Sequence, residues 1–149
     1  MIKILLVDDN EADIKITVRA LSKASVPSMV HTVYDGEQAL QFLKKEYAPG
    51  AQVPFERPDL ILLDVNMPRM DGFEFLRWAK EDAVFKTIPV VIFSSSNNTK
   101  DIQHAYDLGA ASYIQKPIDY NELIQLVESF NRYWGGINRF TKEPKGKQP

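Results

Sequence analysis

The sequence predicts an α/β fold, in which helices cover both faces of a five-stranded parallel sheet. Five short apolar runs are each followed by a stretch whose apolar residues recur at helical spacing. Parallel neighbours need a crossover connection, which is normally a right-handed helix. The loops that leave the strands should therefore lie along one edge of the sheet, and polar residues follow four of the five strands there.

The first strand is predicted at 2–7, and a helix should begin directly after the polar residues that follow it. Asn10 is a suitable N-cap for this helix, and Glu11 and Asp13 suit the positive end of its dipole. The second strand is predicted at 29–33. The next helix should run to about residue 47, and its apolar face consists of Ala39, Leu40, Phe42 and Leu43.

The segment 48–58 contains three prolines and one glycine, which predicts a loop. The third strand, 60–63, is a run of four apolar residues typical of a strand that is buried on both faces. It ends at Asp64. A helix is predicted from Phe73 to a point before Pro89.

The last two units follow the same pattern. A fourth strand at 89–93 precedes the polar segment 94–98, and the helix after it should close at Gly109 in a left-handed conformation. A fifth strand at 112–115 leads to Lys116 and Pro117. The final helix is predicted to begin in a capping box, Asp119 to Glu122, and to end at Gly135 and Gly136.

The composition excludes several classes of function. The chain has 149 residues, 44% of them hydrophobic, and a net charge of −2, which gives no general attraction to nucleic acid or to an anionic membrane. It has no cysteine and only two histidines, so disulfides and thiolate or multi-histidine metal sites are not expected. No signal peptide or spanning segment is apparent, and a cytoplasmic location is expected.

Five polar residues should meet at the carboxyl edge of the sheet: Asp8, Asp9, Asp64, Ser94 and Lys116. Three carboxylates in one shallow pocket cannot all remain ionised without a counter-charge, and Mg²⁺ is the cation that prefers such oxygen ligands. The lysine could hold an arriving anion, and a carboxylate could act as nucleophile. The set predicts a site for phosphoryl transfer.

Each residue taken alone has a structural explanation. Asp8 and Asp9 could be acids at a helix start, Ser94 a capping hydroxyl and Lys116 a surface lysine. These explanations do not account for polar residues at the ends of four apolar strands on one edge. Asp71 differs from the others and is interpreted as a turn residue.

The motifs resemble the receiver domain of two-component response regulators over residues 1–134. The matching features are Asp8-Asp9, the segment 64–72, Ser94, Gly109-Ala110, Tyr113 and Lys116-Pro117. The resemblance implies a flavodoxin-like, doubly wound fold with strand order 2-1-3-4-5. Residues 135–149 are then expected to form a short polar and flexible tail, with no output domain.

The resemblance also implies a role for each matching residue. Asp64 would accept a phosphoryl group from a sensor histidine kinase. Asp9 and Asp64 would bind Mg²⁺ through carboxylates, Asn66 through its backbone carbonyl, and Asp8 through a bound water.

On the other side of the site, Lys116 would pair with phosphoryl oxygens and Ser94 would hydrogen-bond to them. Tyr113 would turn inward after phosphorylation. The peptide bond between Lys116 and Pro117 would be cis.

The implied protein is a switch rather than a turnover enzyme, although it would catalyse its own phosphorylation and dephosphorylation at rates that depend on Asn66 and Ser96. Its output would leave through the face of the fourth helix, fifth strand and last helix, by contact with an unknown downstream protein or by formation of a homodimer. The 48–58 loop and the aromatic end at 131–134 are similar to stand-alone regulators paired with phytochromes, especially cyanobacterial ones. A phytochrome is thus a candidate for the kinase.

Three other classes of protein remain as alternatives. A phosphatase with an aspartyl intermediate typically has a second aspartate two residues after the nucleophile, where this chain has Asn66. A flavin- or nucleotide-binding protein needs a glycine-rich or hydroxyl-rich loop after the first strand, where this chain has acids. A DNA-binding protein is opposed by the mild negative charge.

Overall fold

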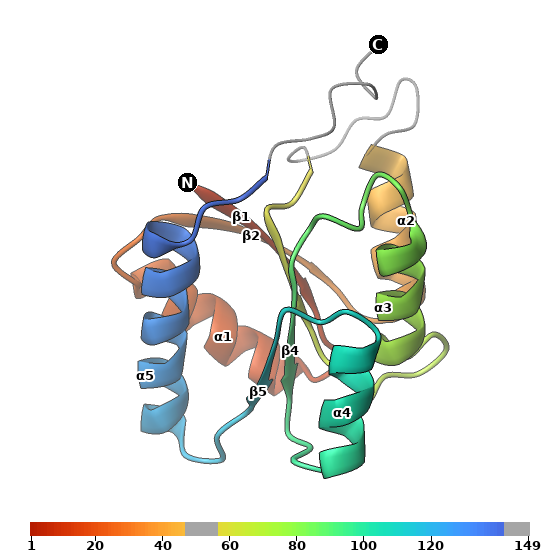
Figure 1. The fold of residues 1–149 in the computed structure, drawn as a ribbon. Helices are drawn as coiled ribbons and strands as arrows, with labels where there is room; N and C mark the ends of the chain where they lie inside the picture. Colours follow the sequence, from red (N-terminus) through yellow and green to blue (C-terminus); the bar gives the residue numbers. More distant parts are fainter. Residues whose placement is uncertain (47–56, 142–149) are drawn as a thin grey trace.

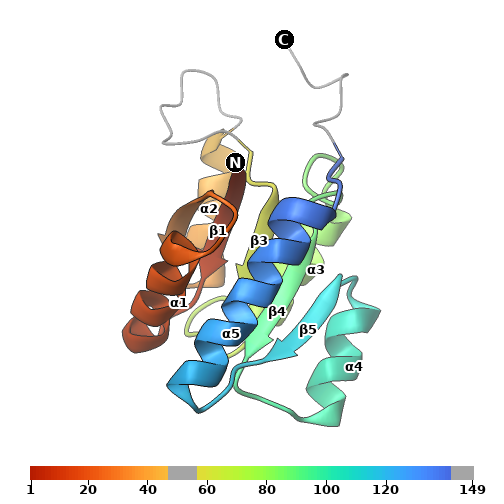
Figure 2. The same ribbon diagram turned by 90° about the vertical axis from the view of Figure 1, so that its left-hand side faces the viewer.

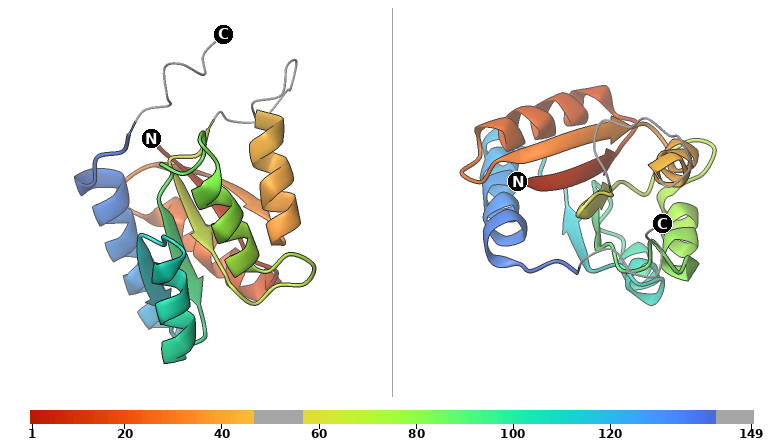
Figure 3. Two further views of the ribbon diagram at one scale, coloured as in Figure 1. Left: turned by 45° about the vertical axis from the view of Figure 1, so that its right-hand side comes forward. Right: turned by 90° about the horizontal axis from the view of Figure 1, so that it is seen from above.

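The computed structural model describes residues 1–46 and 57–141, which form a five-stranded parallel sheet between two layers of helices (Figure 1). The strand order is β2-β1-β3-β4-β5, which confirms the predicted fold class. Helices α1 and α5 cover one face, and α2, α3 and α4 cover the other (Figures 1 and 2). Seen from above, the sheet runs between these two layers (Figure 3).

The elements lie close to the predicted ones. The strands are β1 (Ile2–Val7), β2 (Ser28–Val33), β3 (Leu60–Leu63), β4 (Val90–Ser94) and β5 (Ser112–Gln115). The helices are α1 (Glu11–Lys23), α2 (Gly36–Glu46), α3 (Gly72–Glu81), α4 (Thr99–Asp107) and α5 (Tyr120–Asn131), followed by a π-helical turn, η1 (Arg132–Ile137).

The alternation of side chains along β1 and β3 divides the hydrophobic core into two halves. Ile4 and Leu6 of β1 pack in the cluster that contains residues of α1 and α5. Leu5 and Val7 pack instead with Phe75 and other residues of α2, α3 and α4. Both faces are buried along β3 and along residues 4–7 of β1, which explains why these stretches are continuously apolar.

Most helix ends agree with the sequence. The Asn10 side chain accepts a hydrogen bond from the Asp13 N–H at 3.0 Å, and Gly109 has a φ of 103°. Asp119 accepts from the Glu122 N–H at 3.0 Å. Asp71, interpreted as a turn residue, is the N-cap of α3 and forms a reciprocal capping box with Glu74.

The predicted end of the last helix at Gly135 is wrong. The α-helix ends at Asn131, and the glycine pair lies inside η1. A Cβ atom at Gly135 would lie 2.9 Å from Cγ1 of Val26, so the glycine permits close packing. The buried side chain of Asn131 forms two hydrogen bonds with the backbone of Val26. It accepts from the Val26 N–H at 2.9 Å and donates to the Val26 carbonyl at 2.9 Å.

A second correction concerns the bond between Lys116 and Pro117, which is trans rather than cis. The trans form is favoured by about 0.5–1 kcal/mol in an X–Pro bond, and the hydrogen bond from the Lys116 N–H to the Ser94 carbonyl is formed with this isomer at 2.8 Å.

The predicted 48–58 loop falls largely outside the described residues, as does the part of the predicted 135–149 tail from residue 142 onward. Within the described part of the chain, no helix is both long enough and apolar enough to cross a membrane.

The close approach of α3 to the end of β3 yields a test of the fold. A Cβ atom at Gly72 would lie 2.6 Å from Cα of Val65, and backbone atoms cannot yield as a side chain can. We expect Gly72→Ala to lower the free energy of unfolding by about 1–3 kcal/mol in urea denaturation. The control is Gly136→Ala, whose Cβ atom would lie 3.5 Å from Val26 in ordinary contact, so its stability should change little.

Candidate functional site

The sheet fixes the three charged residues that follow β1, β3 and β5. The Asp8 N–H donates to the Val33 carbonyl at 3.1 Å, and the Asp64 N–H donates to the Val7 carbonyl at 2.9 Å. The Lys116 backbone is held at β4 by its bond to Ser94, described above. The three side chains therefore start from backbone that the sheet hydrogen bonds hold in place, and they converge at the carboxyl edge of the sheet.

Three carboxylates lie together at this edge. One oxygen from each of Asp8, Asp9 and Asp64 lies within 4.8 Å of the other two. Asp8 and Asp64 are buried, whereas Asp9 is exposed and leaves the group open to solvent. Oxygen donors of this kind and number suit a hard divalent cation such as Mg²⁺, with waters as further ligands.

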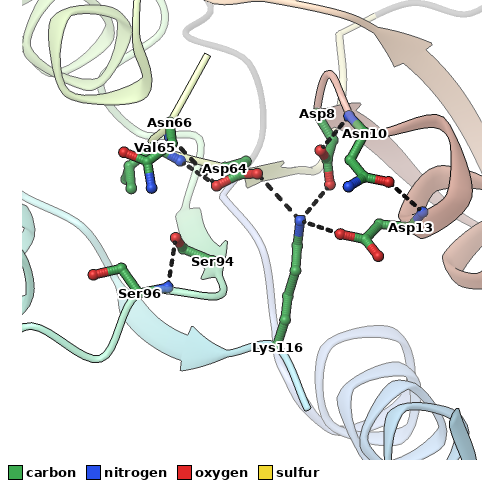
Figure 4. Close-up of polar contacts among 9 residues, drawn as sticks. All are labelled: Asp8, Asn10, Asp13, Asp64, Val65, Asn66, Ser94, Ser96 and Lys116. Atoms are coloured by element: carbon green, nitrogen blue, oxygen red, sulfur yellow. Dashed lines mark hydrogen bonds and ion pairs between the residues drawn. The ribbon is translucent and has the colours of Figure 1, made fainter. Parts of the chain in front are cut away.

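Lys116 neutralises part of this negative charge (Figure 4). Its Nζ lies 2.7 Å from Oδ2 of Asp8, 3.1 Å from Oδ2 of Asp64 and 3.1 Å from Oδ2 of Asp13. The sequence predicts that Lys116 lies at the same edge as Asp8 and Asp64, but it pairs the lysine with an arriving anion rather than with these carboxylates. Asp13 was interpreted from the sequence only as an acid near a helix N-terminus, and its contact with Lys116 is an addition from the structure.

The Asp64 carboxylate is held at both oxygens. Its Oδ1 accepts the N–H of Val65 at 2.7 Å and, more weakly, that of Asn66 at 3.4 Å. Its Oδ2 accepts from Lys116. The side chain thus has a defined orientation, with one oxygen toward the loop and the other toward the ammonium group.

The electrostatics of the site follow from burial and from the excess of carboxylates. Burial raises the pKa of Asp8 from 3.8 to about 6, although bonds from Lys116 and the Asn10 N–H oppose the shift. Burial alone would lower the pKa of Lys116, but Asp8 and Asp64 outweigh that effect and raise it above its ordinary value. Lys116 is therefore charged throughout the neutral range.

Ser94 is fully buried at the end of β4, and its hydroxyl accepts the Ser96 N–H at 3.3 Å. Ser96 in turn donates to the Asp101 carboxylate of α4 at 2.8 Å. The β4–α4 loop is thereby linked at one end to the strand and at the other to the helix.

Tyr113 contacts this loop through Ser96. The Tyr113 hydroxyl donates to the Ser96 carbonyl at 2.9 Å, and the Tyr113 N–H donates to the hydroxyl of Tyr106 at 3.1 Å. The hydroxyl bond holds the Tyr113 ring against the β4–α4 loop. Any movement of Ser94 and its loop would act on the tyrosine through the Ser96 carbonyl.

The loop after Asp64 is fastened to the turn between β2 and α2. Arg69 has a φ of 62°, and its Nε lies 3.0 Å from Oδ2 of Asp35, a carboxylate that is only 1% exposed. The Gly36 N–H also donates to the Met70 carbonyl at 2.9 Å. The sequence analysis does not predict the pair of Asp35 and Arg69, because neither of these two residues belongs to the predicted cluster at the strand ends.

Comparison with known proteins decides the family. Residues 4–128 match the response regulator receiver domain. The chain belongs to this family. It is 33% identical over 136 residues to the probable methanogenesis regulatory protein FilR2 of Methanothrix harundinacea, covering 91% of this chain and 85% of FilR2. It is also 33% identical over 131 residues to response regulator Rcp1 of Synechocystis, covering 88% of this chain and 87% of Rcp1.

Solved structures agree with this assignment to the receiver family. The phosphorylated cyanobacterial phytochrome response regulator RcpA superposes with a TM-score of 0.85 and 41% identity, covering 94% of this chain and 98% of RcpA. The Mn²⁺-bound form of Rcp1 superposes with a TM-score of 0.84 and 30% identity, covering 95% of this chain and 100% of Rcp1. The chain is thus a receiver domain of two-component signalling whose relatives include phytochrome response regulators.

The raised pKa of Asp8 predicts how stability depends on pH. The folded state binds a proton at Asp8 more tightly than the unfolded chain does, so the folded state loses stability as pH rises from about 4 to about 6. We expect the free energy of unfolding of the wild type, in chelator, to fall by up to about 3 kcal/mol relative to Asp8→Asn over this window and to stay level above it.

Urea denaturation at a series of pH values measures this difference. Glu81→Gln, which removes an exposed acid of α3, is the control and should follow the wild type. If the difference in free energy of unfolding between the wild type and Asp8→Asn did not depend on pH, the assignment of the raised pKa to Asp8 would be contradicted.

Proposed function

We propose that this receiver domain is a phosphorylation-driven switch that accepts a phosphoryl group on Asp64 from a sensor histidine kinase in the presence of Mg²⁺. The observation that carries the proposal is the convergence of Asp64, Lys116 and the carboxylates of Asp8 and Asp9 at one edge of the sheet. Few other functions require a fixed carboxylate, a buried ammonium group and a set of metal ligands together.

The chemistry assigned to Asp64 is nucleophilic attack on phosphorus. An Asp64 oxygen forms a bond to phosphorus as the bond between phosphorus and the histidine nitrogen of the kinase breaks. The hydrogen bonds to its Oδ1 orient the carboxylate for this attack. Lys116 stabilises the negative charge on the transferred group.

Mg²⁺ would be held by the carboxylates of Asp9 and Asp64, the backbone carbonyl of Asn66 and, through a water, Asp8. When bound, the ion neutralises charge on the carboxylates and the phosphoryl oxygens. The grouping of the three aspartates supports this ligand set, and the relative Rcp1 has a Mn²⁺-bound form.

The domain is proposed to act as a switch, not as an enzyme with steady turnover. Phosphorylated Asp64 would attract Ser94 and Lys116, and the altered β4–α4 loop would change the contacts of Tyr113. Hydrolysis of the phosphoryl group, catalysed by the domain itself, would reset the switch. Asn66 and Ser96 are the residues expected to influence that rate.

The output is proposed to use the face formed by α4, β5 and α5, through a downstream protein or a homodimer. The half-exposed rings of Tyr106 and Tyr133 offer aromatic contacts of the kind enriched at interfaces. A phytochrome is proposed as the sensor kinase because RcpA is a phytochrome response regulator. Such a kinase would place the protein in the cytoplasm.

The test of the acceptor function is the intact mass after incubation with acetyl phosphate and Mg²⁺. We expect one added phosphoryl group in the wild type, loss of the adduct with chelator, and no adduct in Asp64→Asn. Asp71→Asn is the matched control, because it removes a carboxylate from the same loop and keeps a residue that can cap α3. This variant should be phosphorylated like the wild type.

Two results would contradict the proposal. One is a wild type that folds and binds Mg²⁺ but forms no adduct. The other is an adduct that persists in Asp64→Asn, which would place the phosphoryl group on another residue. Sustained hydrolysis of phosphomonoesters would instead support the phosphatase alternative.

The proposed output is tested by size-exclusion chromatography with light scattering. We expect the wild type to shift toward a dimer when beryllofluoride, a phosphoryl analogue, is added with Mg²⁺. The same concentration of Mg²⁺ without beryllofluoride should leave the wild type at a lower molecular mass. An equal shift in Asp64→Asn would show that association does not depend on the acceptor site.

A further inference from the structure

Among the described residues, Asp13 is the one carboxylate bound to Lys116 that lies outside the proposed metal and phosphoryl sites. It belongs to the first turn of α1, where its N–H donates to the capping side chain of Asn10 at 3.0 Å. Its side chain is 33% exposed, compared with 3% for Asp8 and 10% for Asp64.

The contacts of Lys116 leave it no spare donor. An ammonium group has three N–H bonds, and the structure gives Nζ three carboxylate acceptors, from Asp8, Asp13 and Asp64. A phosphoryl oxygen that binds Lys116 must therefore displace one of them.

The acceptor that is displaced most easily is Asp13. Asp8 is buried, so it would keep the full cost of desolvation if it lost its partner. Asp64 itself carries the phosphoryl group, so its side of the ammonium group stays occupied by the acceptor and the transferred oxygens. Asp13 can turn toward water and recover its hydration. Figure 4 also shows Asp64 and Ser94 on one side of the ammonium group and Asp13 on the other, so movement toward a phosphoryl group on Asp64 is movement away from Asp13.

We propose, on the basis of the acceptor function proposed above, that Asp13 is a positioning residue that holds Lys116 in the resting state and is released when a phosphoryl group binds. Asp13 then opposes phosphorylation twice. It competes for the ammonium group, and it adds negative charge beside a site that receives an anion. The residue sets how readily the domain enters its phosphorylated state.

The competing explanation is that Asp13 only stabilises the N-terminus of α1. Glu11 makes this distinction possible, because it is an acid of the same helical turn and no ion pair joins it to Lys116 among the described residues. Removal of either charge alters the interaction with the helix dipole, but only removal of Asp13 frees Lys116.

The experiment measures binding of beryllofluoride by calorimetry at saturating Mg²⁺. We expect Asp13→Asn to bind the analogue about three- to tenfold more tightly than the wild type, since partly exposed charge pairs contribute about 1 kcal/mol. The control Glu11→Gln should bind within twofold of the wild type. Asp13→Glu keeps a carboxylate within reach of Lys116 and should restore wild-type affinity.

A double-mutant cycle tests whether the effect passes through Lys116. Lys116→Met keeps much of the side chain and removes its donors, so Asp13→Asn should have little further effect in that background. An effect of equal size with and without Lys116 would assign Asp13 a purely long-range electrostatic role and overturn the positioning role.

The remaining outcomes separate this inference from the function on which it rests. If the wild type binds beryllofluoride and Asp13→Asn binds it equally or more weakly, the role of Asp13 is overturned and the acceptor function stands. If the folded wild type binds no beryllofluoride with Mg²⁺ present, the acceptor function itself is overturned.

Discussion

The structure depends above all on the placement of more carboxylates than cations at one edge of the sheet. Asp8, Asp13 and Asp64 share the single ammonium group of Lys116, and Asp9 adds a further carboxylate on the exposed side of the group. Burial makes the ionised form of Asp8 unfavourable, as its raised pKa indicates, and the charge of Asp64 adds to that cost. The arrangement persists because an apolar sheet, buried on both faces, holds the strand ends in place.

Much of this could be predicted from the sequence. Four strand ends carry the polar residues of the site, and the parallel topology brings them together. The acids could be recognised as strand ends because residues 4–7 of β1 and all of β3 are apolar up to Asp8 and Asp64, so each acid marks a sharp boundary. That topology places Lys116 beside Asp8 and Asp64, whereas its pairing with these two carboxylates is a finding of the structure.

The features that were missed depend on side-chain direction rather than on position along the chain. Asp13 and Glu11 look alike in the sequence, yet only Asp13 is oriented toward Lys116. The pair of Asp35 and Arg69 joins two loops that no periodic pattern relates. Gly135 was interpreted as a helix stop, whereas the neighbouring Val26 explains it as a site of close packing.

The bond between Tyr106 and Tyr113 has a consequence for how the molecule can meet another. β5 lies at the edge of the sheet, where an unpaired backbone N–H would invite a strand from a second chain. The hydroxyl of Tyr106 accepts the hydrogen bond of the Tyr113 N–H, so this N–H is already paired. Continuation of the sheet into a neighbouring molecule is thereby hindered at this residue, which favours contacts made by side chains across this side.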